Sequence, residues 1–320
     1  MRAFAWFLGT LLAAGLVTAL IAYPVYELTS ELAPWPFHRV AARVAMLAAA
    51  GGLVWVCRRL GLDSRRALGY GLPWRRFLAV SALFGFAGLV SAAVGAGFLL
   101  GAHLRVLADT IPSVPHLVVT GLASGIAVAL IEETVMRGAM HRAIEKESGA
   151  SSAVLLTAPL FAVLHFFAKA RIPVDQLHWG SGFDLLARSF APLATPALVA
   201  DSFLAWLAVS LVLSLTRVIT GNIAAAIGLH AGWVVVLRIL QESTVPGPAA
   251  RGSAWVGRFD GLLGYWVLPW CAAIGLALWL TRRAWAPYAS GLAGSGADGE
   301  VEGAIEARRS SRTSESSISR

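Results

Sequence analysis

The chain has 320 residues, of which 57% are hydrophobic and only 14% are charged. Soluble domains carry about 25% charged residues, so this composition excludes an ordinary soluble protein and predicts an integral membrane protein. The formal net charge of +8 does not indicate a nucleic-acid partner, because basic residues in the loops of a membrane protein set its orientation in the lipid bilayer.

Eight apolar segments are long enough to cross a membrane, which takes about 20 residues of helix. The first is longer than the core of a signal peptide, about 7–15 residues, so we expect an uncleaved helix. The sequence thus predicts an all-α bundle of about eight transmembrane helices. The expected helices cover residues 5–27, 40–57, 77–100, 117–140, 152–169, 198–218, 221–241 and 262–281.

Arginine placement indicates the orientation of these helices, because basic loops stay in the cytoplasm. The loop after the second helix carries six arginines, and Arg282-Arg283 follow the eighth helix. Both termini are therefore expected in the cytoplasm. Only Lys146 and Lys169 are lysines, and this arginine bias with abundant Ala and Gly is typical of a GC-rich bacterial genome, which favours a bacterial inner membrane.

Two stretches do not fit a spanning helix. Residues 170–197 are interrupted by Pro173, Gly180 and Pro192, which indicates either a lid at the membrane surface or a simple connection. Residues 287–320 are rich in Ser, Gly and mixed charge, so we expect a disordered cytoplasmic tail after a membrane domain of residues 1–286. Between the sixth and seventh helices, Asn222 is a suitable N-cap.

The expected fourth helix carries two adjacent acids, Glu132 and Glu133. Ionisable side chains are costly inside a membrane and usually face a polar cavity with a function. Glu133 shares one helix face with Gly121, Gly125 and Ala129, and small residues mark close helix contacts. Both acids should therefore point into the bundle. Glu133 is also spaced for an i,i+4 ion pair with Arg137. Such a pair would explain a buried Glu133 by a structural role alone.

Two histidines lie in later apolar segments, His165 on the expected fifth helix and His230 on the seventh. A lone histidine in such a helix is more often a core residue than a catalyst. At about 1.5 Å per residue from the expected cytoplasmic ends, Glu132, His230 and His165 lie at depths of roughly 12, 13 and 20 Å. These depths are close enough for one shared site.

A poorly solvated carboxylate can act as a general base, a histidine beside it can pass a proton, and a second histidine can stabilise an oxyanion. Together they predict a site that activates water for hydrolysis. Glu and His are also zinc ligands, so a metal site on Glu132, His165 and His230 stays open. The chain has no HExxH motif, and no cofactor is favoured.

These residues resemble the CPBP family, the CAAX-protease and bacteriocin-processing membrane proteins. Glu132–Arg137 match its EExxxR motif, Phe161 and His165 match its FxxxH motif, and His230 matches the histidine of its third motif. The resemblance covers roughly residues 117–241, and the family fold also has eight helices. It implies an intramembrane endopeptidase that acts on a membrane-associated protein or peptide, with the glutamate mechanism favoured over the metal-dependent one.

The same resemblance assigns roles to single residues. Glu132 and His165 would activate water, and His230 would help form the oxyanion hole. Glu133, Arg137, Phe161 and Trp233 would bind substrate or support the site. The family commonly has asparagine four residues after the third-motif histidine, and here that position is Val234.

The missing asparagine keeps a second hypothesis open, a non-catalytic membrane scaffold or immunity-type protein with the same fold. A third hypothesis is a proton-coupled transporter, since buried Glu and His also form proton relays. The chain has no evident internal repeat, which disfavours a transporter.

Overall fold

The computed structural model describes residues 1–32, 34–167 and 170–285. These residues are mostly helical, which confirms the all-α membrane fold, and six of the helices are long and apolar enough to cross a membrane. The long helices are α1 Arg2–Ser30, α2 Phe37–Arg59, α3 Trp74–Gly101, α4 Val114–Glu133, α5 His141–Leu164, α7 Pro196–Thr220 and α8 Ala224–Ser243, followed by a helical stretch over residues 267–285.

Short elements join these helices. The π-helix η1 (Thr134–Met140) continues α4 directly into α5, and α6 (Ser181–Phe190) precedes α7. Strands β1 (Arg105–Leu107) and β2 (Thr244–Pro246) pair antiparallel, with Val106 opposite Val245, and tie the end of α3 to the end of α8. The remaining 3₁₀ turns are η2 Val174–Gln176, η3 Ala191–Ala194 and η4 Pro248–Ala250.

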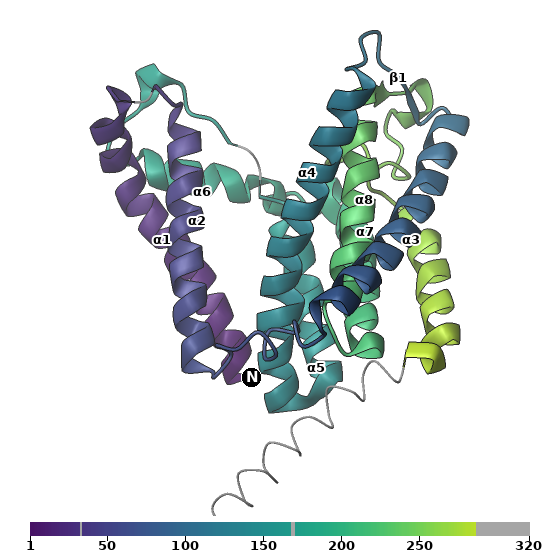
Figure 1. Ribbon diagram of the computed structural model, residues 1–320. Helices are drawn as coiled ribbons and strands as arrows, with labels where there is room; N and C mark the ends of the chain where they lie inside the picture. The colour runs from purple at the N-terminus through teal and green to yellow at the C-terminus, as the bar shows by residue number, and fades with distance from the viewer. Residues whose placement is uncertain (33, 168–169, 286–320) are drawn as a thin grey trace, which may run out of the picture.

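The helices form two groups that diverge from one end of the molecule (Figure 1). Helices α1 and α2 make a hairpin, and α3, α4, α5, α7 and α8 make the main bundle, in which α8 packs between α3 and α4. Helix α6 packs on α1, where Gly182 lies against the backbone of Ala19. The hairpin reaches the main bundle mainly through contacts of α1 with α5 and η1.

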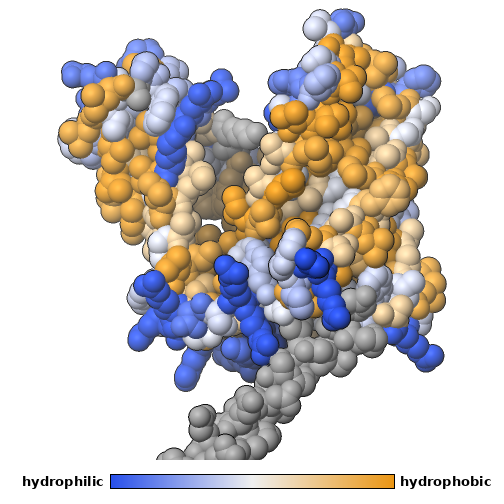
Figure 2. Space-filling view, in the orientation of Figure 1, coloured by the Kyte–Doolittle hydropathy of each residue, from blue (hydrophilic) through white to orange (hydrophobic). Residues whose placement is uncertain are grey.

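The surface agrees with a protein embedded in lipid. Figure 2 shows hydrophobic side chains over the middle of both helix groups and hydrophilic side chains gathered at the two ends. The same view shows a deep hollow between the α1–α2 hairpin and the main bundle, bordered by α4. Exposed aliphatic and aromatic side chains are therefore expected here, because lipid replaces water around the middle of the molecule.

The chain reverses direction at Gly149. This residue has φ +83°, a backbone conformation that residues other than glycine rarely adopt. It divides α5 into two helical pieces. Arg137 lies twelve residues before Gly149 and Phe161 twelve residues after it, and the Arg137 guanidinium lies over the Phe161 ring. The two arms therefore run side by side. Residues 141–148, which lie between two of the expected helices, are instead helical, because neither glycine nor proline occurs among them.

Several expected boundaries were wrong by a few residues. The helix expected to end at residue 169 ends at Leu164. The ring of the next residue, His165, is hydrogen-bonded to the Phe161 carbonyl oxygen in the last helical turn. The last helix begins at residue 267, not 262, because the preceding chain turns through Gly257 and Gly261 at positive φ. The N-cap of α8 is Ile223 and not the expected Asn222, but the Asn222 side chain still accepts a hydrogen bond from the main-chain N–H of Ala224 at the start of the helix.

The interrupted segment 170–197 holds no spanning helix, in agreement with its proline and glycine content. Its longest helix, α6, has only 10 residues. The expected tail 287–320 lies outside the described residues.

Close packing of α8 on α3 depends on glycine. A side chain on Gly232 would clash with the carbonyl oxygen of Gly85, and one on Gly228 would clash with that of Ser81. The Gly121, Gly125, Ala129 and Glu133 face of α4 is buried as predicted, and Gly125 lies against the carbonyl of Ala231 in α8. Both neighbours of α8 therefore approach it at backbone distance, which fixes the position of His230.

We expect Gly232→Ala to destabilise the protein by about 1–3 kcal/mol, because the added methyl must push α3 away from α8. Gly97→Ala in α3 is the matched control, since no atom lies within 4 Å of an added Cβ there. Its higher helix propensity should leave stability unchanged or raise it by up to about 1 kcal/mol. Unfolding of both variants in detergent micelles measures the difference, and equal stabilities would contradict this packing.

Candidate active site

A buried ion pair forms the centre of the site. The Arg137 guanidinium donates to Oε1 of Glu133 at 3.1 Å, and both side chains are completely buried. The i,i+4 pair predicted from the spacing is thus present. Arg137 also donates to the carbonyl oxygen and the hydroxyl of Ser210 in α7, at 3.1 and 2.7 Å. The ion pair therefore joins α4 and η1 to α7.

His230 completes this network from α8. Its Nδ1 lies 2.8 Å from Oε1 of Glu133, and its Nε2 lies 4.0 Å from Oε2 of Glu132. Because a carboxylate accepts hydrogen bonds, Nδ1 carries the proton toward Glu133. His230 is buried, whereas the Glu132 side chain is 33% exposed. Glu132 thus lies at the accessible edge of a buried Glu133–Arg137–His230 network.

The Phe161 ring holds the second histidine near this network. Its centre lies 4.5 Å from the His165 ring, 6.3 Å from the His230 ring and 4.6 Å from the Arg137 guanidinium carbon. The His165 Nδ1 lies 2.8 Å from the Phe161 carbonyl oxygen. A carbonyl only accepts, so Nδ1 donates and the neutral ring keeps an Nε2 lone pair. His165 is also stacked on Trp206 of α7, with 3.7 Å between ring centres.

Five of the predicted residues therefore adjoin one another, namely Glu132, Glu133, Arg137, Phe161 and His230, and His165 adjoins them through Phe161. Trp233 lies three residues after His230 in α8 and contacts α3 and the last helix. Its indole N–H donates to the Ser91 hydroxyl at 3.1 Å, and its ring packs on Trp270. Trp233 thus anchors α8 to α3 and to the last helix, and does not contact the acids.

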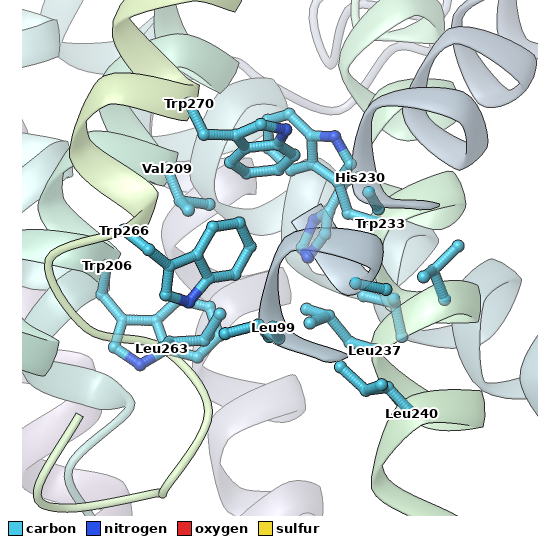
Figure 3. A pocket seen from close by; sticks show the side chains of 14 residues that line it. Leu99, Trp206, Val209, His230, Trp233, Leu237, Leu240, Leu263, Trp266 and Trp270 are labelled. Atoms are coloured by element: carbon cyan, nitrogen blue, oxygen red, sulfur yellow. The ribbon is translucent and has the colours of Figure 1, made fainter. Parts of the chain in front are cut away.

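An apolar cavity lies beside His230 and is also lined by Trp233 (Figure 3). His230 is its one ionisable lining residue, and Trp206, Trp266 and Trp270 form much of its wall. Val234 also lines it. An asparagine at position 234 would therefore face the same cavity as His230.

Sequence reasoning missed the contributions of α7. Ser210 accepts from Arg137, and Trp206 fixes the His165 ring by stacking. Neither carried a signal in the sequence, because serine and tryptophan are common in membrane helices. The π-helix after Glu133 was also missed, although π-helical turns often occur at functional sites.

The residues do not fit a zinc site as they stand. Within the described chain, no group of three or more His, Cys, Asp or Glu side chains is placed to hold one metal ion. His230 also uses Nδ1 for Glu133, and its Nε2 is 4.0 Å from Glu132.

Fold and site together define a membrane-embedded helical protein with acid and histidine side chains in one buried cluster. Residues 114–236 match the family described as type II CAAX prenyl endopeptidase Rce1-like. This is the CPBP family, so the matched part of the chain, about two fifths of its length, is similar to membrane-embedded proteases of that family. A search of curated proteins and a search of solved structures found no match.

We expect Arg137→Gln to lower the free energy of unfolding by about 3–5 kcal/mol, because Glu133 would keep a buried charge without its arginine. Arg142→Gln is the matched control. Arg142 pairs with Glu145 at 2.9 Å but is 39% exposed, so its loss should cost at most about 1 kcal/mol. Denaturant unfolding in micelles measures both variants, and a similar small loss in each would show that the buried pair does not hold the helices together.

Proposed function

We propose that the protein is an intramembrane endopeptidase that hydrolyses a peptide bond in a membrane-associated protein or peptide, using Glu132 as the general base. The observation that carries this proposal is the position of Glu132. Its side chain is 33% exposed, yet it lies beside the buried pair of His230 and Glu133, and its Oε2, the oxygen nearest His230, is buried. A carboxylate there can take a proton from water while the network behind it stays fixed.

His165 is suited to assist the base. Its Nδ1–H is committed to the Phe161 carbonyl, and stacking on Trp206 fixes the ring plane. The Nε2 lone pair is then the atom that can accept a proton or orient the attacking water. In this proposal Glu132 and His165 share the activation of water.

His230 is suited to stabilise the oxyanion. Glu133 accepts its Nδ1 proton, in the manner of the carboxylate that orients the histidine of a catalytic triad. When the ring carries a second proton, Nε2–H can donate to the oxygen of the tetrahedral intermediate. Glu133 and Arg137 act here as positioning residues that hold His230.

The hollow between the hairpin and the main bundle supports a substrate that arrives within the membrane. It borders α4, the helix that carries Glu132. A chain already anchored in lipid could approach from this side without leaving the bilayer. We place the protein in a bacterial inner membrane with both termini in the cytoplasm, on the basis of its arginine-rich loops.

A non-catalytic scaffold of the same fold is the second candidate. Val234 favours this candidate. The family commonly has asparagine at this position, four residues after the histidine, and an asparagine here would face the same cavity as His230. Replacement by valine removes a potential hydrogen-bond donor from that wall. The fold and the buried ion pair would be kept in such a protein, whereas hydrolysis would be absent.

We expect Glu132→Gln to lower the rate of proteolysis by about 10²–10⁴-fold, the range for loss of a general base, while the protein stays folded. The amide has a similar size but cannot take a proton from water. The assay uses the full chain in proteoliposomes with a panel of quenched fluorescent peptides, prenylated and unmodified. Glu31→Gln is the control, since Glu31 is exposed at the end of α1. Cleavage at the wild-type rate would remove Glu132 from the mechanism.

Val234→Asn should raise the cleavage rate, because the amide would face the cavity beside His230 and could donate to the oxyanion. A fully aligned donor is worth about 10²–10³-fold. The gain must disappear when Glu132→Gln is combined with it, since no water is then activated. A rate that stays equal or falls means another group supplies the donor. No cleavage by either protein across the panel favours the scaffold.

A further inference from the structure

A ladder of four polar side chains follows one face of the helix that carries the site. Glu133, Arg137, His141 and Glu145 are each four residues apart, running from α4 through η1 into α5. The first three are completely buried, and Glu145 is partly exposed, with 26% of its side chain accessible. At about 1.5 Å per residue the ladder spans roughly 18 Å, more than half of a hydrocarbon core.

Helix α7 presents a matching polar row to this ladder. Ser210, Ser214 and Arg217 lie at positions i, i+4 and i+7 and are all buried. Ser210 accepts from Arg137 at one end, and Arg217 lies 4.0 Å from Glu145 at the other. We call these seven residues the polar seam. It runs between α7 and the α4–η1–α5 helix, from Glu133 to the Glu145 end of the bundle.

Most of the unpartnered buried polar atoms of the described chain lie in this seam. Six of the eight such side-chain atoms belong to it, and they come from five residues. Natural proteins leave few buried polar atoms unbonded, and those that lack a protein partner are normally bonded to water. The six atoms are Glu133 Oε2, Arg137 Nε, His141 Nδ1, His141 Nε2, Ser214 Oγ and Arg217 Nε.

The chemistry of these atoms identifies the ligand. The seam has two positive charges, Arg137 and Arg217, each beside a negative charge, Glu133 and Glu145, so it has no net charge that would favour an ion. The arginine Nε–H groups need acceptors, whereas Glu133 Oε2 needs a donor, and His141 needs one of each. Water is the small neutral molecule that meets both needs.

We propose that the polar seam holds a chain of bound water molecules that connects the Glu145 end of the bundle with Glu133 and His230. The chain would lie inside the protein, separate from the hollow beside α4. Its existence does not depend on any catalytic activity.

A role for this water rests on the proposed function. Each hydrolysed peptide bond consumes one water molecule, and a membrane-bound substrate over Glu132 would displace water from the open side of the site. The seam reaches the Glu133–His230 pair from the other side. It would therefore resupply the site while substrate stays bound.

Cysteine accessibility tests the hydration directly. Ser214→Cys and Ala205→Cys are made in full-length protein lacking Cys57 and Cys271, and both are treated with Ag⁺ in the folded state. Both positions are fully buried in α7, but Ala205 lies in the apolar core. After denaturation, free thiols are counted with a maleimide. We expect the cysteine at 214 to be blocked at least about tenfold faster, because an aqueous path leads to it. Equally slow blocking at both positions overturns the proposal.

Radiolytic footprinting of the unmodified protein covers the case in which the Ser214→Cys variant does not fold. Hydroxyl radicals form from water, so His141 beside bound water should be oxidised faster than Phe37, which is equally buried but lies in a separate apolar cluster of α1 and α2. Oxidation of His141 no faster than Phe37 rejects a hydrated seam. These readouts need no substrate.

The supply role is tested by Ser214→Leu, which fills the seam without touching Glu132, His165 or His230. The value of kcat should fall about tenfold while KM stays unchanged, because water supply and not substrate binding is impaired. An unchanged kcat in a hydrated protein rejects the supply role alone. Proteolysis lost in Glu132→Gln but kept in Ser214→Leu would separate the two proposals.

Discussion

The Glu133–Arg137 ion pair is the interaction on which the rest of the structure depends. Neither charge contacts solvent, so each must be compensated by protein groups. That requirement brings Ser210 from α7, His230 from α8 and the Phe161 ring from α5 to the same place. Four segments of the chain are thus fixed to one another by the need to satisfy two charges inside a membrane.

Glu132 and Glu133 are neighbours in the chain but have different surroundings, because the first is partly exposed and the second is buried. Glu133 has the arginine and a histidine as partners, whereas Glu132 has only the more distant edge of His230. One carboxylate is held in place and the other keeps an open side. This division is what a site needs when one group must stay fixed and another must exchange protons with a substrate or with water.

Much of this arrangement could be predicted from the sequence. The eight helices follow from apolar length, and the Glu133–Arg137 pair follows from i,i+4 spacing. The buried face of α4 follows from the four-residue spacing of Gly121, Gly125 and Ala129. The α7 partners could not be predicted, because Ser210 and Trp206 gain their meaning only from what α7 packs against. The end of the helix at Leu164 was also missed, because the apolar sequence continues to residue 168 and only the His165 side chain breaks the pattern.

The reversal at Gly149 has a consequence for the register of the site. Glu133 lies sixteen residues before this glycine and His165 sixteen residues after it, and both arms reach the site. The arm from Gly149 ends at Leu164, so His165 lies directly after its last helical turn. A single residue inserted in either arm would move one group by about 1.5 Å and rotate it by about 100° relative to the other. An insertion or deletion in one arm would therefore disturb the site unless a matching change in the other arm restored the register.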